Sequence, residues 1–93
     1  MALKSNSAKH QEKSAILREL RKDAGLTQQQ LAGRLSISRE TLVGIENCYL
    51  QQIESLTSDI EDRWWEICRT TAKPQTKEKW HTHILRKLNI KLI

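Results

Sequence analysis

Residues 26–47 constrain the fold more than any other stretch of the chain, because they hold two amphipathic helix patterns separated by a tight turn at Ser36-Ile37. The first pattern covers about residues 28–35 and the second about residues 39–46, and apolar side chains recur at helical spacing in both. These are Leu31 and Leu35 in the first pattern and Leu42 and Ile45 in the second. Helices this short are unstable alone in water, so both must pack on neighbouring parts of the chain.

Capping residues mark where the helices begin. Thr27 with Gln30 three residues later predicts a capping box at the first helix, and Ser38 is a favoured N-cap for the second. A further helix is expected upstream over about Ser14–Ala24, with Gly25 in the position that commonly ends a helix. The sequence therefore predicts three consecutive short helices before residue 48.

The chain after Asn47 carries another helical stripe, which fits either one long helix or two helices broken near Thr57. The stripe consists of Tyr49, Ile53, Leu56, Ile60, Trp64 and Ile67. Residues 58–61 match a capping box, which would begin the second of two helices at Ser58. Residues 71–76 around Pro74 are expected to be a linker, and a last helix follows. Its apolar face comprises Trp80, Ile84, Leu85 and Leu88, with Asn89 at its end.

The composition favours an all-α domain with a polyanionic partner. The 93 residues include three glycines and one proline, and alternating β-branched runs are nearly absent. Sixteen basic residues against eleven acidic ones give a net charge of +5, which favours nucleic acid, although basic small domains are common. No apolar run approaches the roughly 18 residues of a membrane span, and residues 1–10 lack the features of a signal peptide. Cys48 and Cys68 lack paired spacing, so a cytoplasmic protein with reduced thiols is expected.

Residues 1–13 are polar, carry three lysines and show no apolar pattern. We expect a flexible basic arm, for which two interpretations remain open. The arm either touches a nucleic-acid backbone or is a frayed terminus, as the ends of domains often are.

Residues 26–47 share a set of amino acids with one known family. It consists of Leu26-Thr27-Gln28, Leu31-Ala32, Leu35, Ile37-Ser38-Arg39, Thr41-Leu42 and Ile45-Glu46-Asn47. In these residues, and upstream to about residue 14, the chain resembles the helix-turn-helix of the Cro/lambda-repressor family, the XRE-like DNA-binding domains. Ser36 stands where that family usually has glycine, which predicts a left-handed residue strained by its side chain. Cys48 also stands where the family has glycine, followed there by a proline-containing loop.

The resemblance implies a Cro/repressor-type helix-turn-helix domain. Together with the helix patterns after residue 48, it leads us to expect an all-α fold with a C-terminal helical extension for dimerisation. The expected boundaries are a flexible arm over residues 1–13, the DNA-binding domain over residues 14–70 and the extension over residues 71–93. It also implies a structural ion pair between Arg21 in the first helix and Glu46 at the end of the third.

In this family the helix over residues 39–46 is the recognition helix, whose N-terminal residues meet base edges in the major groove. Arg39 would bridge O6 and N7 of guanine, and Glu40 would either accept from cytosine N4 or simply stabilise the helix dipole. Gln28 and Asn47 would hold phosphates. Gly44 would let the backbone approach DNA or a neighbouring helix. The full set of expected DNA-binding residues is Thr27, Gln28, Arg34, Ser38, Arg39, Glu40, Thr41, Gly44 and Asn47.

The C-terminal half is expected to form a homodimer, because its tryptophans exceed what a small monomer can bury and aromatic residues are enriched at interfaces. The expected interface residues are Trp64, Trp65, Trp80, Ile84 and Leu88. The alternative is that the tryptophans complete the core of the monomer.

The sequence thus predicts a transcriptional regulator that binds double-stranded DNA without a cofactor. It is expected to be a repressor that binds a palindromic operator as a homodimer. An enzyme is not expected, and a zinc site at His81 and His83 with the cysteines is disfavoured, because residues spaced by two lie on different faces of a helix. The competing hypothesis is a protein-interaction module on the same fold, an antitoxin or antirepressor whose partner is a toxin or another regulator. The operator, the regulated genes and any inducer cannot be derived from the sequence.

Overall fold

The computed structural model describes residues 3–89, with side chains for residues 3–86. Within this range the chain forms six helices: α1 (Ala8–Asp23), α2 (Gln28–Leu35), α3 (Arg39–Glu46), α4 (Leu50–Glu54), α5 (Ser58–Cys68) and α6 (Pro74–Asn89). The predicted all-α class is confirmed, since the described residues add only an isolated β-bridge between Lys4 and Tyr49. None of these helices combines the length and the apolar character needed to cross a membrane.

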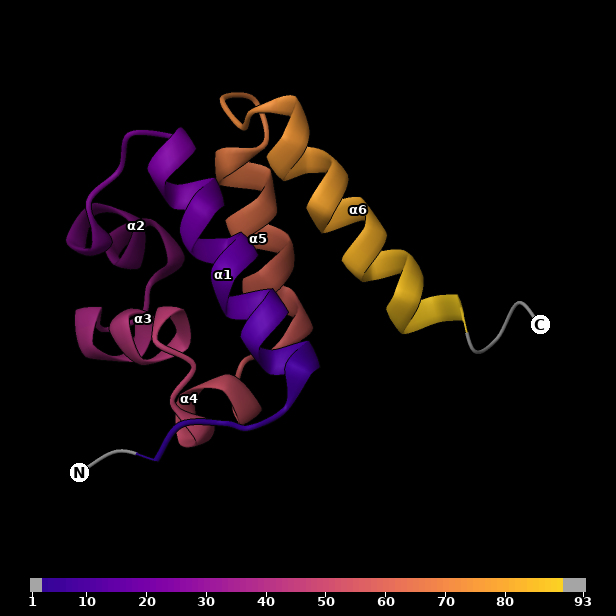
Figure 1. The fold of residues 1–93 in the computed structure, drawn as a ribbon. Coiled ribbons are helices and arrows are strands. Elements are labelled where there is room, and N and C mark those ends of the chain that lie inside the picture. Colours follow the sequence, from indigo (N-terminus) through magenta and orange to yellow (C-terminus); the bar gives the residue numbers. More distant parts are fainter. Residues whose placement is uncertain (1–2, 90–93) are drawn as a thin grey trace.

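Helix α1 is the centre of the fold, and the other helices are arranged around it (Figure 1). Helices α2, α3 and α4 lie on one side of α1 and α6 on the other, while α5 packs against both α1 and α2. Side chains from all six helices share one core, with Ile53 as the contribution of α4. Its fully or almost fully buried members include Leu17, Leu20, Leu31, Leu35, Leu42, Ile45, Trp64 and Trp80. This shared burial stabilises helices α2 and α3, which are too short to form alone.

Helices α1, α2 and α3 end in the same way. A residue with positive φ stands just past each one: Gly25 (φ 70°), Ser36 (φ 58°) and Cys48 (φ 60°). The next amide then donates back into the last turn, as Ile37 N does to Ala32 O over 3.0 Å. This is the Schellman motif, which favours glycine at the positive-φ position. The left-handed residue expected at Ser36 is therefore present, and Cys48 is a second one.

Replacing Ser36 with glycine is expected to stabilise the fold by about 0.5–1 kcal/mol. A residue with a Cβ pays about 1–2 kcal/mol to be left-handed, and the extra freedom of unfolded glycine offsets part of that gain. Ser36 is exposed, so no packing is lost. Urea unfolding measures the change. The control variant Ser36→Ala keeps the Cβ and should show no gain; an equal gain would mean that Ser36 is not strained.

The boundary expected at Ser14 is wrong. Helix α1 begins at Ala8, with Ser7 as its N-cap, and Ser14 is buried within the helix. Lys13, assigned to the arm by the sequence analysis, lies in α1 and pairs with Glu61 over 3.1 Å. Residues 8–13 are therefore helical, because one face of this extension can pack on the rest of the fold.

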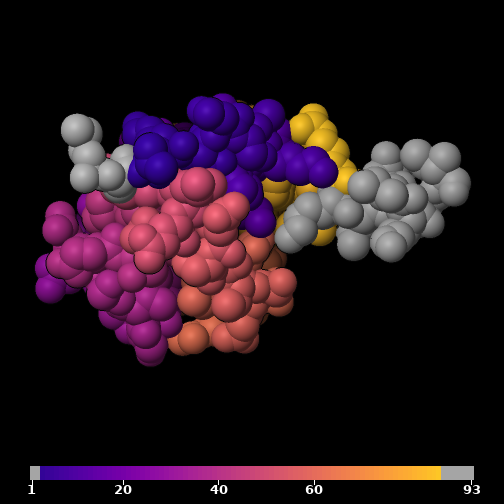
Figure 2. Space-filling model, turned by 90° about the horizontal axis from the view of Figure 1, so that it is seen from below, coloured from indigo at the N-terminus to yellow at the C-terminus, as the bar shows by residue number. Residues whose placement is uncertain are grey.

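The residues before α1 are also held in place. Ser5 N donates to Cys48 O over 2.9 Å, and Leu50 N donates to Leu3 O over 2.7 Å. Figure 2 shows this indigo N-terminal segment lying along the pink residues that follow α3. The pairing joins parts of the chain that are far apart in sequence, so no local pattern could reveal it. Residues 3–7 form a short strand-like segment beside α3 and α4.

The segment from residue 50 to residue 68 could have been one long helix or two shorter ones, and the structure has two. Helix α4 ends at Glu54, and α5 begins at Ser58 with Thr57 as its cap. Thr57 Oγ1 accepts the hydrogen bond from Ile60 N over 3.2 Å, so the cap lies one residue earlier than expected.

Asp23, at the end of α1, anchors the start of α6. Its Oδ2 accepts hydrogen bonds from Lys73 N (3.0 Å) and Thr76 Oγ1 (2.7 Å). Burial raises the pKa of Asp23, but these two hydrogen bonds and the Lys73 charge outweigh it and leave the pKa below its ordinary value. The expected linker over residues 71–76 is therefore short and fixed, and α6 already begins at Pro74.

Two tryptophans assigned to a dimer interface belong to the core of the single chain. Trp64 is 0% exposed and its Nε1 donates to Leu17 O over 3.0 Å, and Trp80 is 4% exposed. A side chain buried within one chain cannot contact a partner, so this assignment is wrong for both. Trp65 and Ile84 remain partly exposed, and the side chain of Leu88 lies outside the described residues.

Candidate nucleic-acid interface

Two contacts with α1 fix the position of α3. Arg21 and Glu46 form a bidentate ion pair, in which Arg21 Nε lies 2.7 Å from Glu46 Oε2 and Nη2 lies 3.1 Å from Oε1. The side chains are 13% and 1% exposed respectively, so the ion pair suggested by the sequence lies in the interior. Ser14 Oγ donates to Ile45 O over 2.6 Å. Both contacts hold the last turn of α3, and neither involves its first turn.

The first turn of α3 is open. Arg39 and Glu40 are exposed, and neither side chain has a hydrogen bond or ion pair among the described residues. Ser38 Oγ accepts from Thr41 N over 3.0 Å and donates to Thr41 Oγ1 over 2.8 Å, so these hydroxyls cap the helix. Val43, one turn after Arg39, is only half-buried and could contact a thymine methyl group. The sequence analysis missed Val43 because an apolar residue there resembles a core position.

The expected residues of α2 are partly engaged within the chain. Thr27 and Gln30 form the predicted capping box, with Gln30 N donating to Thr27 Oγ1 over 3.0 Å. Gln28 Nε2 donates to Glu46 Oε1 over 3.2 Å, which ties the start of α2 to the end of α3. The guanidinium of Arg34 is exposed and free of partners among the described residues. The start of α2 therefore offers amide groups and part of the Gln28 amide to a ligand.

Gly44 lies on the same side of α3 as Glu40 but is covered rather than open, contrary to expectation. It is buried, and a Cβ added to it would lie 2.5 Å from Cγ of Gln52 in α4. Of the two uses considered for this glycine, the structure therefore supports close approach of a neighbouring helix.

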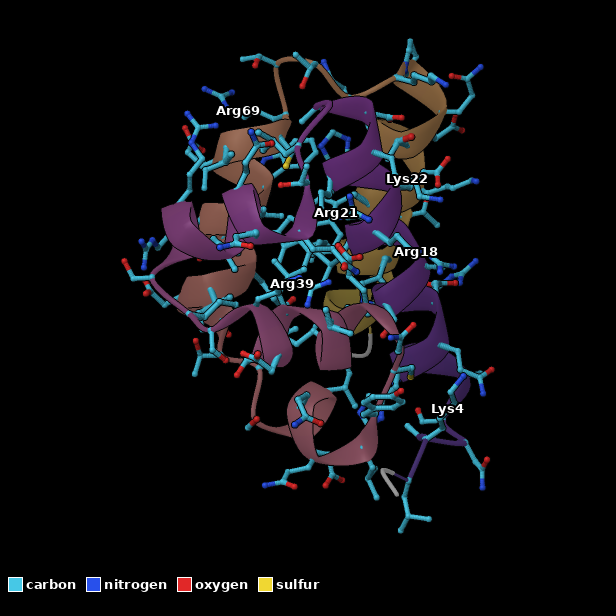
Figure 3. The ribbon with its side chains drawn as sticks, turned by 90° about the vertical axis from the view of Figure 1, so that its left-hand side faces the viewer. Lys4, Arg18, Arg21, Lys22, Arg39 and Arg69 are labelled. Atoms are coloured by element: carbon cyan, nitrogen blue, oxygen red, sulfur yellow. The ribbon has the colours of Figure 1, made fainter. Side chains whose placement is uncertain are left out.

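A polar hollow of about 380 Å³ opens beside the end of α3, with Lys4, Arg18 and Asn47 in its lining. Neither cation has an ion-pair partner among the described residues. Figure 3 shows Lys4, Arg18 and Lys22 along one edge of the face that carries α2 and α3. Of the three residues named in the lining, Asn47 was expected as a phosphate contact and Lys4 only as part of the basic arm. Lys4 reaches this place through the pairing of the N-terminal segment with the residues after α3, and Arg18 is placed there by α1.

The fold and this surface define a class of protein, a helical domain in which α2, a tight turn and α3 form a helix-turn-helix. A family model described as a helix-turn-helix domain matches residues 14–48, from within α1 to the turn after α3. This part of the chain is a helix-turn-helix domain of the XRE/Cro-like type, and it indicates a DNA-binding regulator. Such domains are typically without enzymatic activity. No curated protein and no solved structure matches the chain significantly.

Other chemically reactive groups occur among the described residues. No cluster of three or more histidine, cysteine or acidic residues suited to a metal ion occurs among them. Burial raises the pKa of Cys68 to about 11, so its thiol stays protonated at neutral pH. His83 Nδ1 lies 2.6 Å from Glu12 Oε1, and this hydrogen bond, aided by the Arg86 charge, outweighs burial and lowers the pKa of Glu12. This contact joins α6 to α1.

Proposed function

We propose that the chain is a sequence-specific regulator of transcription that binds double-stranded DNA with α3 in the major groove. The observation that carries the proposal is the contrast between the two ends of α3. Its last turn is held to α1 by Arg21 and Ser14, whereas Arg39 and Glu40 in its first turn are exposed and have no partner among the described residues. A rigidly held helix with free polar groups at its N-terminal end suits the reading of base edges.

Each residue of the surface has a separate role in this proposal. Arg39 reads guanine through O6 and N7. Glu40 either accepts a hydrogen bond from cytosine N4 or stabilises the helix dipole. Phosphates are held by the amides at the start of α2, by Asn47 and by Lys4 and Arg18 beside it. Phosphate contacts set the register of the protein on the duplex but carry no sequence information.

The change Arg39→Ala is expected to remove most of the preference for the selected site, by about 5- to 150-fold, while leaving weak binding that depends on salt. Lys4→Ala, its matched control, should weaken binding to every duplex alike and lower the salt slope by about one. The site is first selected from a random duplex pool. Anisotropy titrations then compare it with a random duplex at several salt concentrations. Equal losses by both variants on both duplexes would contradict the assignment.

The proposal includes a homodimer on a palindromic operator, because one recognition helix reads too few base pairs to define a site in a genome. Half-sites would lie about 34 Å apart, one helical turn, and the principal extents of 40 × 33 × 20 Å allow two copies to occupy them side by side. Repression follows most simply, since covering a promoter requires no further surface. Among the described residues, an apolar surface suited to a second copy is the groove between α5 and α6, lined by Trp65, Ile84 and Leu85 among others.

The same groove favours one alternative, a protein-interaction module that docks a toxin or another regulator. Figure 1 shows α6 across α1 from α2 and α3, so the groove can stay open while α3 lies on DNA. Leu85 in this groove is 58% exposed. Light scattering of the purified chain at micromolar concentration separates the two possibilities. A dimer supports the homodimer, and a monomer supports a different protein partner.

A further inference from the structure

The recognition helix lacks a side chain at one position of its reading face, Gly44. This residue follows Glu40 by four positions, so the two lie one above the other on the same side of α3. Glu40 is exposed, yet Gly44 is buried. Because glycine has no side chain, the atoms that cover it must belong to another part of the molecule.

The covering atoms belong to Gln52 of α4. Its Cγ, Cδ and Cβ would lie 2.5, 2.8 and 3.0 Å from a Cβ built on Gly44. The Gln52 side chain therefore occupies the space into which a side chain at position 44 would project. A Cβ at position 44 would force the Gln52 side chain to move.

The start of α4 is anchored by backbone hydrogen bonds, and this anchoring fixes the position of Gln52 over Gly44. Tyr49 N donates to Gly44 O over 2.9 Å in the Schellman turn, and Leu50 N donates to Leu3 O over 2.7 Å from the N-terminal segment. Helix α4 is thus fixed to α3 on one side and to residues 3–5 on the other. These bonds hold Gln52 against α3.

The carboxamide of Gln52 is free to bind a ligand. Gln52 is only half-buried, and its side-chain amide has no hydrogen-bond partner among the described residues. A glutamine carboxamide can donate to N7 and accept from N6 of adenine in the major groove, as a bidentate pair. Arg39 and Glu40 cannot make this bidentate contact with adenine, because a guanidinium only donates and a carboxylate only accepts, whereas the carboxamide does both.

We infer that Gln52 reads an adenine in the DNA site, and that α4 thereby supplies the base contact that Gly44 leaves vacant on α3. This inference rests on the proposed function and extends it to a residue outside the recognition helix. Gly44 contributes to it, because a residue without a side chain lets Gln52 keep this position.

The experiment uses the full chain and a duplex pool with random sequence. The wild-type chain, Gln52→Ala, Gln52→Glu and the control Gln51→Ala, an exposed neighbour, are each used to select bound duplexes. Gln52→Ala is expected to lose preference at one A·T pair of the site by about 5-fold or more and to keep the others. Gln52→Glu should favour cytosine at that position, because a carboxylate accepts from N4. Gln51→Ala should select the wild-type site. Urea unfolding verifies that each variant is folded.

Two results would overturn the inference alone: Gln52→Ala selects the wild-type site at every position, or it binds all duplexes more tightly because Gln52 merely obstructs the groove. A wild-type chain that selects no sequence would overturn the proposed function as well. The two failures are therefore distinguishable.

Discussion

Replacing Trp64 with alanine is expected to destabilise the fold by about 3–5 kcal/mol, the range found for large aromatic side chains removed from a core. Trp64 is completely buried, and its indole nitrogen donates to Leu17 O in α1. The variant loses that hydrogen bond as well as the packing between α5 and α1. The free energy of unfolding of native proteins is only about 5–15 kcal/mol, so the variant should be close to unfolding. Urea unfolding followed by circular dichroism measures the loss.

Trp65→Ala is the matched control, because the two residues are neighbours in α5 and differ mainly in burial. Trp65 is half-buried and stacks on Trp80 with ring centroids 6.3 Å apart. Its removal should cost clearly less stability, and it should shift a homodimer towards monomer if the groove between α5 and α6 is the interface. Similar stability losses for both variants, or a Trp64→Ala chain that is stable but monomeric, would contradict the division made here between core and interface.

The features that could be predicted from the sequence are those set by neighbours along the chain. The bounds of α2 and α3 follow from their caps and apolar spacing, since Thr27 with Gln30 and Ser38 bind amides only three residues away. The left-handed residue at Ser36 was predictable through the resemblance, because the related domains usually have glycine at this turn. Local chemistry determines these features, so a local pattern suffices to find them.

The features that could not be predicted depend on contacts between distant parts of the chain. The sequence alone cannot tell whether Trp64 faces Leu17 or a second copy of the chain. The packing of α5 against α1 determines that Trp64 lies in the core. The expected basic arm is in part a helix because Lys13 meets Glu61, and in part a strand-like segment because Ser5 meets Cys48. Gly44 was assigned to the DNA face for the same reason: its position on α3 was clear, but its cover by Gln52 was not.

The change Arg21→Met is expected to cost about 3–5 kcal/mol, because it leaves the carboxylate of Glu46 buried without its main counter-charge. The Glu46 side chain is 1% exposed, and within the described part of the chain it would retain only the hydrogen bond from Gln28. Arg21 Nη1 also donates to Leu26 O over 2.8 Å, so the turn between α1 and α2 would lose a contact too. Urea unfolding of the variant beside the wild-type chain gives the difference.

The control is Arg86→Met, which breaks an ion pair with Glu12 in which the Arg86 side chain is 63% exposed. Water and salt already screen an exposed pair, so this change should cost no more than about 1 kcal/mol. The double variant Arg21→Met with Glu46→Leu removes the stranded charge and should regain most of the lost stability. If Arg21→Met costs no more than Arg86→Met, the pair does not hold α3 to α1. The rigid placement of Arg39 on which the proposed DNA readout depends would then need another source.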